Sequence, residues 1–164
     1  MKPINLPIFP LKLVVLPGTI QGLQIFEPRY LNMVKQCMSN ASNFVISYKS
    51  DRFDDFDFGI EKVGTSVQIV DFNNLPNGLL GITVKAESKV SLNNIIQLED
   101  KSYLGEVLPL TEPEVDDQSL LAKYPDLIEV LVKLKEHPEI KTLQLDIDLD
   151  SADSVSYHLG NLIP

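Results

Sequence analysis

The chain has 164 residues, 44% of them hydrophobic, which suffices for one full domain, or one domain with a small appendage, around a substantial core. Its formal net charge of −9, from 23 acidic and 14 basic residues, argues against binding to nucleic acid or to an anionic membrane surface, because both require clustered Lys and Arg. A lone cysteine rules out an internal disulfide, and we find no signal-peptide features and no run of about 20 apolar residues, so we expect a cytoplasmic protein without a membrane span.

The first 40 residues predict two strands and a helix. Residues 4–16 and 19–26 are rich in Val, Leu and Ile, and the turn dipeptide Pro17-Gly18 separates them. Apolar residues then recur at helical spacing, at Tyr30, Leu31, Val34, Cys37 and Met38. Pro28 suits the first helical position, since its missing N–H would be unpaired there. On this face Cys37 is interpreted as a core residue rather than a reactive thiol.

The middle of the chain predicts further strands. Asn77-Gly78 is a strong hairpin signal. The expected strands are residues 43–48, 63–72, 79–84, 89–98 and 103–110, with a loop of aspartates and phenylalanines at 50–59. Many short strands around one helix favour a small barrel over a parallel sheet.

The composition changes at the acidic segment 111–117, which we interpret as a linker. A second helix is expected from near Pro125 to His137-Pro138, and a third after Asp150 or Ser151. The predicted fold class is therefore α+β, mainly β. It consists of a barrel with one embedded helix over residues 1–112, followed by a helical appendage over 113–164 that packs on the barrel.

Several motifs resemble one family along nearly the whole chain. Leu6-Pro7-Ile8-Phe9-Pro10-Leu11, Val14-Val15-Leu16-Pro17-Gly18 and Ile25-Phe26-Glu27-Pro28-Arg29-Tyr30 are similar to the opening of the Lon protease N-terminal, substrate-recognition domain in its stand-alone form. Val63-Gly64-Thr65, Ile69-Val70-Asp71-Phe72 and Leu75-Pro76-Asn77-Gly78-Leu79-Leu80-Gly81-Ile82 resemble its central hairpin. Ser154-Val155-Ser156-Tyr157 with Leu159 resembles its closing helix.

This resemblance implies a PUA-like β-barrel with a small helical subdomain that recognises unfolded segments or partner proteins. Two departures are visible. Relatives usually continue past Leu162-Ile163-Pro164 with another helix, so the chain is expected to be truncated at its C-terminal end. Where relatives often carry a basic Arg-Arg-Phe-like strand, this chain has Ser88-Lys89-Val90.

The motifs of catalysis are missing, so we predict that the chain is not an enzyme and needs no cofactor. No Gly-x-x-x-x-Gly-Lys-Ser/Thr loop is present to hold nucleotide phosphates. Gly64-Thr65-Ser66 is not a nucleophile elbow, because Gln68 stands where the second glycine is required. A small hydrolase is therefore disfavoured.

No metal site is predicted. Asp146, Asp148 and Asp150 imitate the start of a calcium loop, but Ser151 and Tyr157 stand where glycine and glutamate are needed. The alternation of Leu143, Leu145, Ile147 and Leu149 with polar residues favours an extended segment with one buried face.

Two local motifs leave alternatives. Glu27, Arg29 and Tyr30 form either an anion clamp or a structural corner in which Glu27 pairs with Arg29 and Tyr30 enters the core; we favour the corner. In the loop 50–59, Phe53 and Phe56 are our candidate peptide-binding residues, with a lid over the barrel as the open alternative. We expect Phe58, beside Gly59, to be buried.

Taken together, the sequence predicts a cytoplasmic module that binds unfolded proteins or peptides and possesses neither metal nor cofactor. The alternative is a PUA-like RNA-binding domain, against which the charge of −9 argues.

Overall fold

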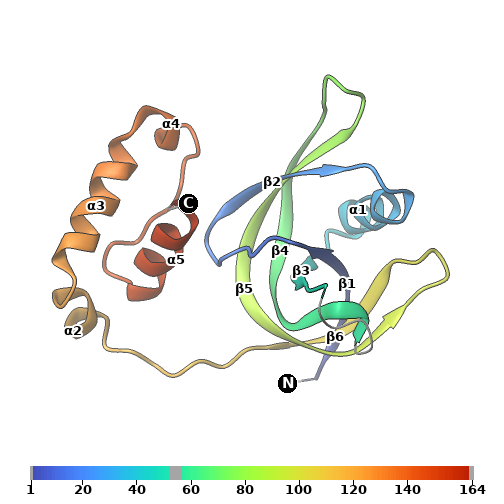
Figure 1. The fold of residues 1–164 in the computed structure, drawn as a ribbon, viewed down its shortest axis with the longest axis horizontal. Helices are drawn as coiled ribbons and strands as arrows, with labels where there is room; N and C mark the ends of the chain where they lie inside the picture. Colours follow the sequence, from blue (N-terminus) through green and yellow to red (C-terminus); the bar gives the residue numbers. More distant parts are fainter. Residues whose placement is uncertain (1, 52–56, 163–164) are drawn as a thin grey trace.

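The computed structural model describes residues 2–51 and 57–162. Six strands and one helix form a β-rich unit, and four further helices form a separate group on one side of it (Figure 1). In chain order the strands are β1 Ile4–Leu11, β2 Ile20–Ile25, β3 Phe44–Lys49, β4 Ile60–Asn74, β5 Leu80–Gln97 and β6 Tyr103–Pro109. The helices are α1 Pro28–Asn40, α2 Asp117–Ala122, α3 Pro125–Glu136, α4 Pro138–Lys141 and α5 Ala152–Leu162, and a 3₁₀ turn, η1, spans Asp57–Gly59. The expected α+β class, made mainly of strands, is confirmed.

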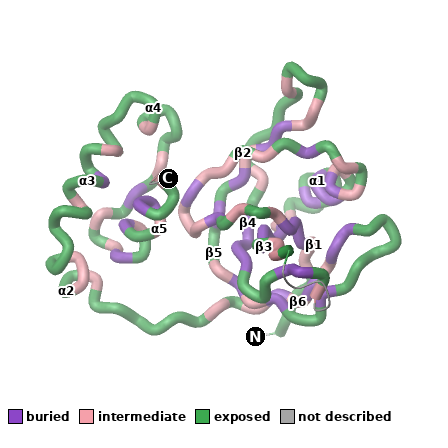
Figure 2. The backbone as a smooth tube through the Cα atoms, in the orientation of Figure 1, coloured by how far each residue is buried: buried purple, intermediate pink, exposed green. Residues whose placement is uncertain are grey.

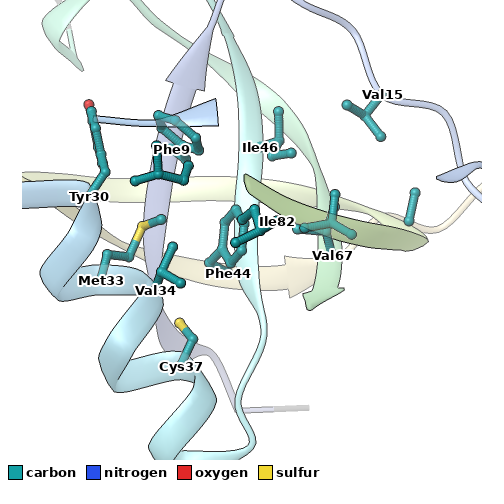
Figure 3. Packing of buried hydrophobic residues seen from close by; sticks show 13 residues of the cluster. Phe9, Val15, Tyr30, Met33, Val34, Cys37, Phe44, Ile46, Val67 and Ile82 are labelled. Atoms are coloured by element: carbon teal, nitrogen blue, oxygen red, sulfur yellow. The ribbon is translucent and has the colours of Figure 1, made fainter. Parts of the chain in front are cut away.

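Helix α1 lies where the sequence predicts it, but Met38, expected on its buried face, is exposed, and Met33 is buried instead. Pro28 occupies its first position, and Ala41, at φ 49°, ends it in the left-handed conformation with its N–H donating to the Cys37 carbonyl. Its buried face carries Tyr30, Met33, Val34 and Cys37. These side chains point at the strands, so the helix closes one face of the β-unit (Figure 3).

The strands pair in the order β2-β5-β4-β3-β1-β6, and β6 also pairs with β5. All pairs are antiparallel except β1 with β3. The pairings therefore run from β5 through β4, β3, β1 and β6 back to β5 as a ring, with β2 added alongside the first half of β5.

Strand β5 departs from the sequence prediction. Residues 79–84 and 89–98 were expected as two strands, but β5 is one strand of 18 residues. The polar stretch between them stays in the ladder because Lys85 lies opposite both Ile20 and Gln68, while Ala86 lies opposite Val67 and its side chain is buried. Register shifts between Ser66 and Val67 on β4 and between Asn93 and Ile96 on β5 let the long strand bend around the ring.

Two apolar clusters fill the β-unit. The larger lies between α1 and the strands and is centred on Phe44, which is fully buried (Figure 3). The smaller lies inside the ring around Ile8, Leu92 and Tyr103. Buried positions accordingly concentrate in the β-unit, whereas most of the helical unit is exposed (Figure 2).

The helical unit has a core of its own. Leu131, Ile147, Val155 and Leu159 are buried together, and Leu131 is fully buried. Helix α3 runs from Pro125 to Glu136, as predicted, and α5 begins after Ser151, whose Oγ accepts the Ser154 N–H at 3.2 Å. The predicted buried face of the segment before α5 holds for Ile147, which is buried, and for Leu145 and Leu149, which pack against the same cluster, but Leu143 lies in a turn and is exposed.

Helices α2 and α4 were not predicted. Residues 111–117 were interpreted as linker, but α2 already begins at Asp117. The reason is a cap, because the Asp116 carboxylate accepts the Ser119 N–H at 3.3 Å and its hydroxyl at 2.8 Å. Those contacts lower the pKa of Asp116.

Helix α5 joins the two units. Buried His158 packs on the turn at Gly18, where a Cβ would lie 3.4 Å from the imidazole Cε1. Its Nδ1 lies 2.7 Å from the Ser154 carbonyl, so Nδ1 carries the proton as donor. Beside it the Lys89 ammonium, paired with Glu112, lies 5.0 Å from the centre of the Tyr157 ring. The expected packing of the helical appendage on the β-unit thus runs through these contacts.

Candidate functional site

A cleft of about 220 Å³ opens at the N-terminal end of α1. Phe26, which links β2 to α1, stands at this cleft with 66% of its surface exposed. Exposure of a phenylalanine to that degree is unusual next to a well-packed core and leaves an aromatic face for a partner. The residues lining the cleft come from β1, the β2–α1 corner and the end of β3: Phe9, Pro10, Leu11, Gln24, Ile25, Phe26, Glu27, Arg29, Tyr30 and Lys49.

The inner wall of the cleft is rigid. The Phe9 and Tyr30 rings pack with their centroids 4.3 Å apart, and both side chains are almost fully buried. Burial raises the pKa of Tyr30 to about 12, so its phenol stays neutral at physiological pH.

The corner beside the cleft is structural, as the sequence favoured. Arg29 Nη2 donates to Glu27 Oε1 at 3.1 Å, and Nη1 donates to the Lys101 carbonyl at 2.7 Å. The guanidinium also lies 4.7 Å from the centre of the Tyr30 ring. Through these two hydrogen bonds and the ring contact, Arg29 holds the α1 corner against the β5–β6 turn.

The predicted peptide-binding pair, Phe53 and Phe56, lies outside the described residues. The ends of its loop are described, and one of them follows a residue that lines the cleft. Lys49 lines the cleft, and the Ser50 N–H donates to the Gly59 carbonyl at 2.8 Å. The described ends of the loop therefore meet each other, and the strand that leads into it ends at the cleft with Lys49.

The expectation for Phe58 is wrong. This residue is 42% exposed, with only one side of its ring on Tyr103 at a centroid distance of 5.3 Å. Asp57 and Phe58 both have positive φ, 49° and 58°, and this left-handed turn directs the side chain along the surface instead of into the core.

A second hollow, of about 300 Å³, opens at the other end of α1. Met38 on the helix and Val70 and Phe72 on β4 expose 40%, 50% and 57% of their surfaces there. Sequence reasoning missed Phe26, Val70 and Phe72. Their apolar character was visible in the sequence. Their exposure depends on how far α1 and β3 extend alongside the other strands.

A third hollow, of about 210 Å³, lies within the helical unit and is almost entirely apolar. Its lining comes from α2, α3 and α5 and the connections between them: Leu120, Leu121, Tyr124, Leu127, Ile128, Ala152, Val155, Ser156 and Leu159.

The polar groups offer little chemistry within residues 2–51 and 57–162. No three His, Cys, Asp or Glu side chains there are grouped to hold a metal ion. At the aspartates that imitate a calcium loop, the Asp148 carboxylate accepts the Asp150 N–H at 2.9 Å. Cys37 is buried, as expected, and burial raises the pKa of its thiol. No helix in this part of the chain has the length and apolar character to cross a bilayer.

Comparison with known families matches residues 5–164 to the substrate-binding domain of the ATP-dependent protease La (LON). Lon protease 1 of Thermus thermophilus is 29% identical over 155 residues, covering 87% of this chain and 18% of that protein. Lon protease of Halothermothrix orenii is 22% identical over 168 residues, covering 96% of this chain and 22% of that protein. The chain thus spans about a fifth of the length of these relatives.

Solved structures agree with the sequence match. A Lon N-terminal domain protein from Xanthomonas campestris superimposes with a TM-score of 0.73 at 27% identity, over 98% of this chain and 83% of that one. The N-terminal domain of Lon protease from the Mycobacterium avium complex gives a TM-score of 0.65 at 16% identity, over 98% of this chain and 96% of that one. The second similarity concerns the fold alone.

Proposed function

This chain belongs to the family of the Lon substrate-binding domain, and from that premise we propose that it is a non-catalytic module that binds unfolded proteins or peptides. The observation that carries the proposal is the cleft at the start of α1, where the exposed Phe26 stands beside a rigid aromatic wall. An exposed aromatic side chain on a rigid support loses little entropy when a partner covers it. Binding of apolar segments is the function that such a surface serves best.

We further propose that Phe53 and Phe56 contribute to this surface, because Lys49, directly before their loop, lines the cleft and the described ends of the loop meet each other. The net charge of −9 favours basic over acidic clients. We interpret the ring of strand pairings as the PUA-like barrel that the family resemblance implies. A cytoplasmic location and a role in protein quality control complete the proposal.

The test is binding of reduced and carbamidomethylated ribonuclease A, an unfolded basic polypeptide, followed by fluorescence anisotropy. We expect F26S and the double variant F53S/F56S each to weaken binding about tenfold or more, as aromatic hot spots do. V132S is the matched control, since Val132 is an exposed apolar residue on α3 and 40% of its surface is accessible.

Melting curves separate the two roles left open for the loop. If F53S/F56S lowers the melting temperature sharply, the phenylalanines cover the barrel and are not client contacts. If the wild-type chain does not bind the unfolded probe at all, or binds folded ribonuclease A equally well, the proposed function is wrong. Submicromolar binding of a defined RNA at physiological salt would favour the RNA-binding alternative.

A further inference from the structure

Strand β4 has one open side. Its first half pairs with β3 on one side and β5 on the other, but the pairing with β3 starts at Phe44, opposite Val67. From Gln68 to Asn74, β4 pairs only with β5, and no described residue pairs with its other side. These seven residues form an open strand edge about 24 Å long.

The hairpin register shows which backbone groups this edge presents. The Leu75 N–H donates to the Leu79 carbonyl, so these two residues form a hydrogen-bonded pair at the hairpin end. Because hydrogen-bonded and non-hydrogen-bonded pairs alternate in antiparallel ladders, Asn74 and Phe72, opposite Leu80 and Ile82, are non-hydrogen-bonded pairs. Their N–H and C=O groups therefore point away from β5, towards the open side.

A contact inside the protein supports this orientation. The Phe72 N–H donates to Oδ1 of the neighbouring Asp71 at 2.8 Å, and Asp71 is exposed. The donor is thus occupied by a surface carboxylate of its own strand. Charges on open edges are a known means of discouraging unwanted strand pairing, and a carboxylate in this position can be displaced by the carbonyl of an incoming strand.

The space beside the edge suits an extended chain. The hollow of about 300 Å³ lies between residues 68–72 and the C-terminal end of α1. Phe72 lies opposite buried Ile82 in the register, so its ring is on the face of the sheet that α1 covers. With Met38 across the hollow, it provides an apolar site next to the open backbone groups.

We propose that an extended segment of an unfolded client polypeptide binds here by adding a strand to β4. This inference rests on the proposed function and names a binding mode for it: main-chain hydrogen bonds to residues 68–74, with apolar client side chains on Met38 and Phe72. Main-chain recognition does not depend on client sequence, which suits a module that meets many unfolded chains. The charge of −9 again favours basic over acidic segments. This hollow and the cleft at Phe26 lie at opposite ends of α1, which has 13 residues and is about 20 Å long. One extended client can therefore reach both sites.

The decisive comparison is F72P against F72A, with carbamidomethylated ribonuclease A as the probe. Both variants remove the ring, but only proline also removes the outward N–H, which the ladder with β5 does not use. We expect F72P to bind about fivefold or more weakly than F72A, the loss typical of a main-chain hydrogen bond together with the steric block. Asp71→Ala frees the same N–H and is expected to tighten binding.

A second measurement covers the case that F72P does not fold. In the wild-type chain, hydrogen–deuterium exchange of the peptide containing residues 68–74 should slow when the probe is bound. Equal binding by folded F72P and F72A, or unchanged exchange of this segment while the probe is bound, would overturn strand addition and leave the proposed function standing. Absence of any probe binding by the wild-type chain would overturn both.

Discussion

Gly64 shows at the scale of a single residue how tightly the ring is closed. A Cβ on Gly64 would lie 2.6 Å from Val45 Cγ1 and 2.9 Å from the Ile46 carbonyl oxygen. The second atom belongs to the backbone of β3, which pairs with Gly64 through Ser47. Only glycine therefore permits β3 and β4 to approach this closely at the point where β4 turns into the ring.

We expect Gly64→Ala to lower the free energy of unfolding by about 2 kcal/mol or more, because backbone on one side and a packed core on the other leave no room for relaxation. Urea denaturation followed by circular dichroism measures this. Gly22→Ala is the matched control in β2, since nothing lies within 4 Å of its Cβ position. A loss for Gly64→Ala as small as that for Gly22→Ala would mean that the strands can separate there without cost.

At the scale of elements, the polar link between β5 and α5 fixes the helical unit on the β-unit. Lys89 on β5 pairs with Glu112 in the linker, and the Tyr157 hydroxyl of α5 donates to Glu112 at 3.4 Å. The hydrogen bond from Lys89 lowers the pKa of Glu112, and the same bond raises the pKa of Lys89. Lys89 thus holds a structural place in β5, where it ties the strand to the linker.

The link predicts a dependence on pH. Because the folded pKa of Glu112 is below its ordinary 4.5, the contribution of this group is present above that pH and is lost as the pH falls through the folded value. At alkaline pH, the contribution of Lys89 to stability is lost as the pH rises through its folded pKa, which lies above the ordinary 10.5. Melting temperatures of Glu112→Gln should therefore fall slightly below wild type at pH 7, and the difference should shrink as the pH falls below 4.5. The same difference should shrink in 1 M salt, and a difference that stays constant from pH 7 down to the acid end of the folded range would show that Glu112 acts by packing instead.

At the scale of the whole molecule, two cores of unequal size lie side by side. The β-unit has two clusters and a ring of pairings, whereas the helical unit has one cluster with four buried apolar side chains and contacts the β-unit through α5. Small cores exposed on several sides open at lower free energy than the strands they are attached to. We propose that the boundary near residue 112 separates two units of different local stability.

Leu131→Ala tests this difference, since Leu131 is fully buried at the centre of the helical cluster. Truncation should destabilise the helical unit by about 2–5 kcal/mol, the cost of a cavity in a packed core. In hydrogen–deuterium exchange, α2 to α5 should then exchange quickly while β3 and β4 keep their wild-type protection. Simultaneous loss of protection in both units would show that the chain unfolds as one cooperative body.

What the sequence alone determined were the features encoded by local signals. The spacing of Tyr30, Val34 and Cys37 identified α1 and its buried face, Pro28 and Pro125 marked helix starts, and Asn77-Gly78 marked the hairpin. Ordered motifs carried the family resemblance. Each of these depends on residues close in the chain, where hydrogen-bonding and steric preferences act directly.

Only the tertiary structure decided how distant segments limit one another. Residues 85–88 have no strand signal of their own, yet they lie in β5 because β4 pairs with Lys85, Ala86 and Ser88, and β2 reaches Lys85 from the other side. The open edge of β4 exists because β3 pairs with β4 only as far as Val67, and Phe72 lies in the part beyond. Phe26 is exposed in the connection between β2 and α1. Burial and strand pairing are properties of surfaces brought together from positions far apart in the chain, so composition and periodicity could identify the apolar residues but not which of them remain free to meet a partner.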